Sequence, residues 1–231
     1  AEWSAPAASS QTLADQASRF RSAFKTDSGS RDVGLPLLVH RRCQSPMFEV
    51  SNLIAYAEQM VHAVGPPETG PIEKALGKSR WIDVTGDAET KWCPAEGKIV
   101  IDMLAALAES GVNKPDIFII TPFKVIEQEM RRLLETKTDL FGKLGVRADE
   151  WARDRVGTIH TFQGREARAV ILLLGAPKSS QHRARQWASS PPNIINVAVS
   201  RAKHNLYVVG SATAWSAAGS SLQILQRKLK D

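Results

Sequence analysis

The sequence has few of the features that mark secreted, membrane-spanning or metal-binding proteins. Its only cysteines are Cys43 and Cys93; so few, without a Cys-x-x-Cys pair, argue against disulfides or a zinc site and favour a reducing compartment. No apolar run reaches the ~18 residues that cross a bilayer, and residues 1–20 lack the basic start and apolar stretch of a secretory signal. No cluster of Asp, Glu and His has the spacing of metal ligands. We therefore expect a cytoplasmic, intracellular protein with no membrane partner and no metal site of its own.

The sequence also lacks the phosphate-binding loop of many nucleotide hydrolases. That loop reads G-x-x-x-x-G-K-[ST], because its backbone amides surround phosphates and its lysine reaches the terminal ones. The nearest match is Gly77-Lys78-Ser79, but Ile72 stands where the first glycine is required, and no strong strand precedes it. No acidic pair follows an apolar strand to hold magnesium either. We therefore predict a simple turn at residues 77–79.

Composition allows a well-packed domain with an anionic partner. Hydrophobic residues make up 43% of the 231 residues, which is enough for one large domain, or one domain with extensions, to bury a core. The formal net charge is +6. A basic surplus favours partners such as nucleic acid or phosphate, although many soluble proteins are mildly basic.

The order of the predicted elements indicates an α/β fold with a mainly parallel sheet, because short apolar strands alternate with amphipathic segments. Strands are predicted at 35–40, 81–85, 117–121, 156–160, 169–174 and 206–210, and helices at 11–24, 53–64, 97–110, 122–135 and 220–229. Ser51 and Asn52 are predicted to cap the second of these helices. Loops are predicted at 26–34, 65–71 and 176–192, and residues 137–155 are charged and irregular. In such sheets, binding sites gather at the carboxyl ends of the strands, and Thr121, His160, Thr161 and Gln163 are expected there.

Residues 156–174, VGTIHTFQGREARAVILLL, place a polar cluster between two strand patterns. Gly164 allows the backbone to bend or to approach a ligand closely. Glu166 is a carboxylate able to accept hydrogen bonds from ribose hydroxyls, and Thr161 offers a hydroxyl of the kind that contacts phosphates. A helix start with Glu166 near its N-terminus would explain the carboxylate alone, but not the whole string.

Residues 193–210, NIINVAVSRAKHNLYVVG, place Arg201 among small apolar residues. An arginine in such surroundings is costly to bury without an anionic partner. That partner is either Glu166 or another carboxylate of the chain, or an anion from outside such as a phosphate.

Two further segments carry polar residues of interest. Residues 39–52, VHRRCQSPMFEVSN, contain Arg41 and Arg42, which alone would be a solvated basic pair. Residues 120–130, ITPFKVIEQEM, place Thr121 between a strand and a helix start. Its hydroxyl suits a phosphate, and it also suits the cap of a helix; the two roles are compatible.

Together and in this order, the four segments resemble motifs of the superfamily 1 helicases, in the branch that holds the nonsense-mediated-decay RNA helicase and its DNA-processing relatives. Residues 39–52 resemble the segment that begins the second RecA-like lobe, usually Gln-Tyr-Arg-Met-His-Pro; the other three resemble motifs IV, V and VI. The resemblance covers about residues 35–210. It implies a RecA-like three-layer sandwich, a P-loop NTPase-like fold without the P-loop itself, over residues 35–231, with residues 1–34 as an N-terminal helical extension.

The resemblance also implies roles for single residues. Arg42 and Arg201 would be catalytic, reaching the γ-phosphate of ATP, and such an arginine contributes ~10³–10⁵ in rate. Arg41, which replaces a tyrosine that stacks on adenine, would stack through its guanidinium plane. The remaining implied contacts are to the nucleotide for Gln163, Gly164 and Glu166, and to nucleic acid for Thr121 and Thr161. His160-Thr161 replace the usual Asp-Ser but keep the hydroxyl.

The predicted function is therefore the C-terminal motor domain of an ATP-dependent DNA or RNA helicase that travels 5′ to 3′. ATP and Mg²⁺ would be held mainly by an N-terminal RecA-like lobe of the same protein, so the isolated chain is expected to be inactive. Its partners would be that lobe and single-stranded nucleic acid. The alternative is a non-catalytic module with a RecA-like fold that binds nucleic acid or protein.

Overall fold

A parallel sheet forms the centre of the fold. The computed structural model describes residues 10–26, 29–34, 38–162, 164–189 and 193–230. Within these ranges the sheet has five strands in the order β5-β9-β8-β6-β7, all parallel. They are β5 (Arg80–Asp83), β6 (Ile117–Thr121), β7 (Val156–Thr158), β8 (Ala167–Leu173) and β9 (Ala202–Gly210). The predicted α/β class and parallel sheet are confirmed, consistent with a RecA-like fold.

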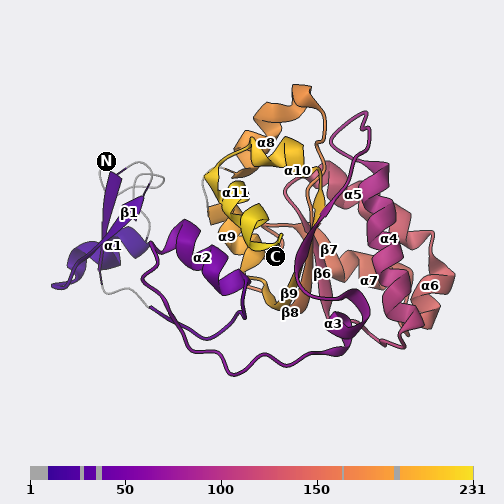
Figure 1. Ribbon diagram of the computed structural model, residues 1–231, viewed down its shortest axis with the longest axis horizontal. Helices are drawn as coiled ribbons and strands as arrows, with labels where there is room; N and C mark the ends of the chain where they lie inside the picture. Colours follow the sequence, from indigo (N-terminus) through magenta and orange to yellow (C-terminus); the bar gives the residue numbers. More distant parts are fainter. Residues whose placement is uncertain (1–9, 27–28, 35–37, 163, 190–192, 231) are drawn as a thin grey trace.

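Helices cover both faces of this sheet, giving three layers (Figure 1). One layer contains α3 (Pro71–Leu76), α4 (Pro94–Glu109), α5 (Lys124–Glu135), α6 (Thr138–Lys143) and α7 (Ala148–Arg155). The other contains α2 (Met47–Ala55), α9 (Asn193–Val199), α10 (Ala212–Ser216) and α11 (Ser220–Lys228), with α8 (His182–Ser189) beside α9 and preceded by the 3₁₀ turn Ser179–Gln181.

The continuous apolar runs of the sequence are the central strands. All five residues of β6 are buried, and β8 is buried except for the half-buried Arg168. A parallel strand is covered on both faces, so its sequence shows no alternation. The strand predictions at 117–121, 169–174 and 206–210 are therefore confirmed. The turn predicted at residues 77–79 is a bend that leads from α3 into β5.

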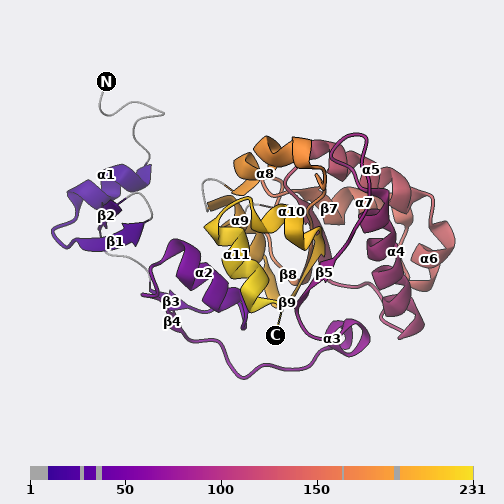
Figure 2. The ribbon, with the colours of Figure 1, turned by 45° about the horizontal axis from the view of Figure 1, so that its top comes forward.

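The N-terminal segment differs from its prediction. The expected helix over 11–24 is α1 (Ser10–Ala17) followed by β1 (Ser22–Thr26). The helix ends early because the Ser18 hydroxyl bonds to the backbone N–H and carbonyl of Phe20. The expected loop at 26–34 contains β2 (Gly29–Val33), which pairs antiparallel with β1. Figure 2 shows α1 and this hairpin beside α2 and away from the main sheet.

The helix predicted at 53–64 begins and ends earlier, as α2 (Met47–Ala55). It starts directly after Pro46, its N-cap residue, which makes no side-chain capping bond. Asn52 is not its cap. The Asn52 side chain accepts a hydrogen bond from the Met60 N–H at 2.9 Å and donates to the Met60 carbonyl. This fixes the return of the chain to β4 (Val61–His62), which pairs parallel with β3 (Val39–His40); the rest of the strand predicted at 35–40 is outside it, and residues 35–37 are not among the described ones.

Two segments predicted as irregular or loop contain helices. Residues 137–155 form α6 and α7, which are anchored by the buried Phe141 and Trp151 with ring centroids 5.2 Å apart. The segment 176–192 contains α8, whose Arg185 is buried at its inner side. A few buried anchors thus hold short helices whose sequences show little apolar periodicity.

Glu96, near the start of α4, is a buried carboxyl group. It is 1% exposed; its Oε2 accepts a hydrogen bond from the Gly175 N–H at 2.7 Å, and its Oε1 has no hydrogen-bond partner among the residues that the structure describes. Burial raises the pKa of Glu96 to about 8, and the bond from Gly175 opposes this only in part. The folded protein therefore holds a proton on Glu96 at pH values where an unfolded chain releases it.

Glu96 should make stability depend on pH. Because the folded pKa is raised, its favourable contribution is fully present below pH 4.5 and is lost as pH rises through about 8. Glu96→Gln cannot ionise, so its free energy of unfolding should gain on the wild type by up to about 1.4 kcal/mol per pH unit across this window. Urea unfolding at several pH values measures it. The exposed Glu89→Gln is the control and should follow the wild type; parallel profiles for Glu96→Gln would contradict the prediction.

Gly97 should resist substitution for a steric reason. A Cβ at Gly97 in α4 would overlap the Trp92 ring and lie 3.1 Å from Leu133 Cδ2, whereas a Cβ at Gly142 in α6 meets nothing within 4 Å. Gly142→Ala should stabilise the protein by about 0.5–1 kcal/mol through helix propensity. Gly97→Ala should destabilise it by roughly 1 kcal/mol, because overpacking costs more than propensity returns. Thermal unfolding of both variants tests this, and equal gains would refute the overlap.

Candidate functional site

The predicted site residues lie at both ends of the sheet. Thr121 ends β6 and Thr161 follows β7, at the carboxyl ends as predicted. Glu166 and Arg201 instead lie directly before β8 and β9, whose first residues, Ala167 and Ala202, are paired. Of the residues expected at the carboxyl ends, Thr121, His160 and Thr161 lie there, and Gln163 is outside the described residues. The pairing of Ala167 with Ala202 brings the carboxylate and the arginine to the same pocket at the amino end of the sheet.

A polar cavity of about 720 Å³ opens at this amino end. It lies between the segment leading into α2, the loop before β8, and the junction of α9 with β9. Its polar lining residues are His40, Arg41, Arg42, Ser51, Tyr56, Glu166, Asn196, Ser200, Arg201 and Lys203. We call this cavity the polar pocket. It unites the predicted Arg41, Arg42, Glu166 and Arg201, which are up to 160 positions apart in the sequence by their numbers.

Glu166 is held by two cations in the polar pocket. Its Oε2 is 3.1 Å from Arg42 Nε, and its Oε1 is 2.5 Å from Lys203 Nζ. The hydrogen bond from Lys203 is the largest cause that holds the pKa of Glu166 below its usual value, and Arg42 adds to it. Lys203 was not among the predicted site residues. Its place two residues after Arg201 at the start of a strand is the signal that would have indicated it.

Arg201 is anchored by backbone carbonyls. Its Nε donates to the Val197 carbonyl at 3.0 Å, and its Nη1 donates to the carbonyls of Arg165 at 3.0 Å and Phe162 at 3.4 Å. Only 8% of Arg201 is exposed, and burial followed by the charge of Arg42 lowers its pKa. Among the described residues no carboxylate pairs with it. Its bonds tie the end of α9 to the loop before β8.

The segment that carries Arg42 is fixed by a group of contacts around Cys43. His40 Nε2 accepts the Cys43 N–H at 2.9 Å, and His62 Nε2 lies 3.1 Å from the Cys43 carbonyl. Phe48 packs against both imidazole rings. Burial, helped by Arg42, lowers the pKa of His40, which keeps the ring neutral and able to accept. Next in the chain, the Gln44 N–H donates to the Lys203 carbonyl at 2.8 Å, so the two flanks of the polar pocket are joined directly.

Cys43 itself has a structural role. It is fully buried, and burial raises the pKa of its thiol to about 12 even though Arg42 and Arg201 are close. The thiol contacts the Ser200 carbonyl at 3.5 Å. A neutral thiol of this kind is a poor nucleophile.

The loop from β7 to β8 contains the remaining predicted nucleotide contacts. Gly164 has a φ of +85° and is exposed, a conformation that favours glycine. Gln163 lies outside the described residues. Phe162 is buried against Phe118, with ring centroids 4.3 Å apart. Thr161 is exposed, with its hydroxyl 3.1 Å from that of Thr158.

Thr121 has surroundings that differ from those of Thr161. It is fully buried, and its Oγ1 accepts the Phe123 N–H at 3.4 Å. This is the local, cap-like role that the sequence left open beside the phosphate contact. Because Thr121 is fully buried, its hydroxyl is not accessible to a phosphate in this conformation.

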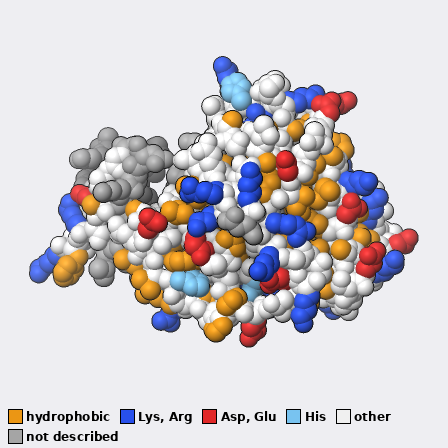
Figure 3. Space-filling view, viewed as in Figure 1, with side chains coloured by type: hydrophobic (Ala, Val, Ile, Leu, Met, Phe, Trp, Pro, Cys, Tyr) orange, Lys and Arg blue, Asp and Glu red, His pale blue; other side chains and the backbone are white. Residues whose placement is uncertain are grey.

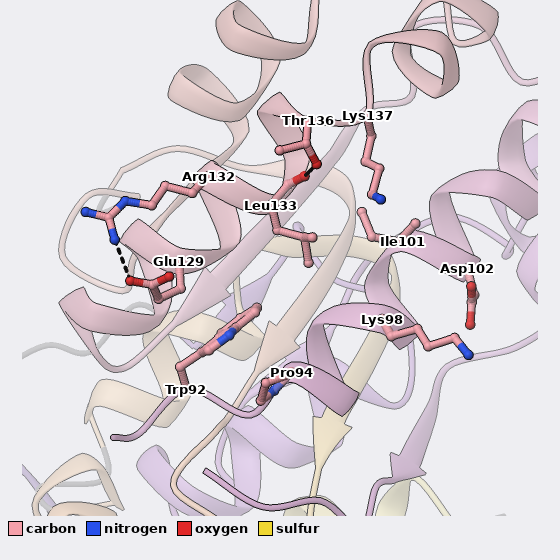
Figure 4. Close-up of a pocket in the computed structure, with 10 residues that line it drawn as sticks. All are labelled: Trp92, Pro94, Lys98, Ile101, Asp102, Glu129, Arg132, Leu133, Thr136 and Lys137. Carbon is pink, nitrogen blue, oxygen red and sulfur yellow. Dashed lines mark hydrogen bonds and ion pairs between the residues drawn. The ribbon is translucent and has the colours of Figure 1, made fainter. Parts of the chain in front are cut away.

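A second cavity, of about 560 Å³, lies between α4 and α5 (Figure 4). Trp92, Ile101 and Leu133 give it largely apolar walls, and at its rim Arg132 is paired with Glu129 at 2.6 Å. It contains none of the predicted site residues. Figure 3 shows Lys and Arg side chains gathered in the middle of one face of the molecule, with isolated Asp and Glu side chains among them.

The described part of the chain holds neither a metal cluster nor a membrane span. No group of three His, Cys, Asp or Glu side chains in it is arranged to bind a metal ion. No helix in the same ranges is long and apolar enough to cross a bilayer.

Comparison with known proteins identifies the family. DNA-binding protein SMUBP-2 of Mesocricetus auratus is 28% identical over 123 residues, which are 53% of this chain and 11% of that protein. DNA polymerase alpha-associated DNA helicase A of Schizosaccharomyces pombe is 28% identical over 117 residues, 51% of this chain and 15% of that protein. The match thus spans a small part of these relatives. A family model described as AAA domain matches residues 40–213. The chain therefore belongs to the AAA-domain family of superfamily 1 helicase C-terminal regions.

Proposed function

We propose that this chain is the second, C-terminal motor lobe of an ATP-dependent helicase, and that the polar pocket receives ATP. Residues 35–231 would be the lobe, and residues 1–34 an extension of it. The observation that carries the proposal is the charge of the pocket. Among its lining residues Arg41, Arg42, Arg201 and Lys203 face one carboxylate, Glu166. A pocket with such a cationic excess suits a polyphosphate.

The pairing of Arg42 supports a role in sensing the terminal phosphate. Arg42 is 43% exposed at its side chain and shares Glu166 with Lys203. It would turn from Glu166 to the γ-phosphate, while Lys203 keeps Glu166 ionised and oriented to accept bonds from a ribose hydroxyl. A surface ion pair costs little to break, so this exchange is easily driven by a phosphate.

Arg201 would act as the arginine finger from its anchored position. Its guanidinium is already desolvated and oriented by three carbonyls, so little reorganisation would be needed to stabilise charge on the phosphate. Arg41 and the half-buried Tyr56 both line the pocket and would border the base. Gly164 would allow the loop that contains Gln163 to approach the nucleotide.

The residues present fit ATP but leave its metal to another source. ATP supplies the phosphoanhydride bond whose hydrolysis drives closure and opening of the two lobes. Mg²⁺ requires oxygen ligands such as carboxylates, and Glu166 already has two cationic partners. We therefore assign Mg²⁺ and the phosphate-binding loop to an N-terminal lobe of the same protein.

Single-stranded nucleic acid is the proposed track. Thr161 is exposed at the carboxyl end of β7 and is the better of the two predicted backbone contacts, because the Thr121 hydroxyl is buried. Phosphate contacts of this kind do not distinguish DNA from RNA. The names of the relatives, a DNA-binding protein and a DNA helicase, favour DNA.

ATP hydrolysis by the longer parent protein tests the proposal. The parent should hydrolyse ATP faster when single-stranded DNA is added, and the isolated chain should show no turnover because it lacks the phosphate-binding loop. Single-stranded RNA is added in a separate arm to compare the two tracks. Robust turnover by the isolated chain, or no stimulation by either nucleic acid, would contradict the proposal.

Substitutions of Arg42 and Arg201 should lower the stability of the chain by different amounts but lower ATP turnover alike. Arg201→Met should lower the free energy of unfolding of this chain by about 1–3 kcal/mol, because three hydrogen bonds are lost and the Arg165 carbonyl is left without its donor. Arg42→Met should cost less than about 1 kcal/mol, because its ion pair is partly exposed. Both should reduce ATP turnover of the parent by ~10³ or more. Wild-type ATP turnover by the Arg42→Met variant would show that Arg42 has no role in hydrolysis.

A further inference from the structure

Trp187 is a large aromatic side chain that the fold holds at the surface. It lies on α8 and is 54% exposed. Four residues earlier on the same helix is Arg183, which is also exposed and forms no ion pair within the described ranges. Residues four apart share one face of a helix. The sequence of α8, HRARQWAS, contains no acidic residue, so this face combines an indole with uncompensated positive charge.

Trp187 is backed by a second ring rather than by loose side chains. It stacks on Phe123, with ring centroids 6.1 Å apart and an interplanar angle of 28°. Lys91 Nζ lies 5.4 Å from the centroid of Phe123 on its ring face. Phe123 is 6% exposed and packs in turn near the buried Trp215. We call the stacked rings of Trp187 and Phe123 the platform. It is continuous with the core through Trp215, and Trp187 is its exposed end.

Two polar anchors fix α8 and so fix Trp187. The buried Arg185 donates from Nη1 to the carbonyls of Ala176 at 2.6 Å and Lys178 at 2.7 Å. At the other end of α8, the Ser189 hydroxyl donates to the Ala218 carbonyl at 2.5 Å. Burying the Arg185 guanidinium is costly. The helix that its bonds hold in place, α8, presents the Trp187 indole at the surface. A preorganised aromatic surface of this kind loses little side-chain entropy when it binds a flat partner.

The platform lies on the side of the sheet proposed to face nucleic acid. Phe123 follows Thr121 by two residues, at the carboxyl end of β6, and Thr161 follows the neighbouring strand β7 at the same end. The polar pocket lies before β8 and β9, at the opposite end of the sheet. Trp187 is therefore not part of the proposed ATP site.

We propose that Trp187, supported by Phe123 and flanked by Arg183, stacks on a base of single-stranded nucleic acid. The base would lie on the exposed indole, and the adjoining phosphate would pair with Arg183. Every base has a π-face, so such a contact tolerates any sequence. The inference rests on the proposed function, and adds to it a contact with the bases, where Thr161 contacts only the backbone.

The experiment compares two strands of equal length that differ only in their bases. Fluorescence anisotropy measures the Kd of this chain for a labelled oligothymidine and for an abasic strand with the same phosphates. Trp187→Ala should raise the Kd for oligothymidine by roughly 5- to 150-fold, the effect of losing one stacked base, and leave the Kd for the abasic strand unchanged. Trp187→Phe should keep most of the affinity. Arg183→Gln should weaken binding to both strands.

The control variant is Phe20→Ala, which removes another exposed aromatic ring, 72% exposed, from the segment between α1 and β1; it should bind like the wild type. Equal Kd values of the wild type and Trp187→Ala for oligothymidine would overturn the inference and leave the proposed function standing. A loss of equal size on both strands would also overturn base stacking. If the wild type binds neither strand, the proposed nucleic-acid role fails, and the inference fails with it.

Discussion

The polar pocket depends on one buried guanidinium that is bound by backbone carbonyls. Arg201 connects the last turn of α9 with the loop before β8 through three carbonyl groups. These two segments precede adjacent parallel strands, so the bonds set the distance between them at the amino end of the sheet. Lys203 then projects from β9 toward Glu166. Arg42, in the segment before α2, is the second cation that contacts this carboxylate. If Arg201 were absent, the Arg165 carbonyl would lose its donor, and the carbonyls of Phe162 and Val197 would keep only the Arg165 N–H and the Ser200 hydroxyl.

The distribution of charge in the pocket follows from this arrangement. Arg201 is desolvated and pairs with no carboxylate of the described residues, whereas Glu166 is near the surface and has two cations. One positive charge is therefore fixed and uncompensated, and another is held by a partner from which it separates at small cost. An anion entering the pocket would meet a rigid donor and a movable one. The residue types alone do not show that Arg201 is fixed while Arg42 can move.

How much of this the sequence predicted depends on the kind of signal. The central strands were predictable because burial on both faces requires unbroken apolar runs, as in residues 117–121. Arg42, Glu166 and Arg201 could be singled out because their motifs are local, and the structure places all three at the polar pocket. The pairing of Lys203 with Glu166, and the role of Arg185 in forming α8, were not found. These depend on contacts between segments far apart in sequence, and a short helix anchored by one buried arginine has no apolar period to detect.

The two sides of the polar pocket are formed by segments that are far apart in the sequence. Cys43 contacts Ser200, which is 157 positions later, and Gln44 bonds to Lys203. Contacts this distant in sequence close large loops, and the entropy of loop closure opposes their formation. During synthesis on the ribosome, the segment around Arg42 therefore emerges long before the strand that completes its surroundings. The pocket cannot be complete before residues 200–203 have been synthesised, so a chain that ends earlier lacks the side of the pocket that Arg201 and Lys203 form.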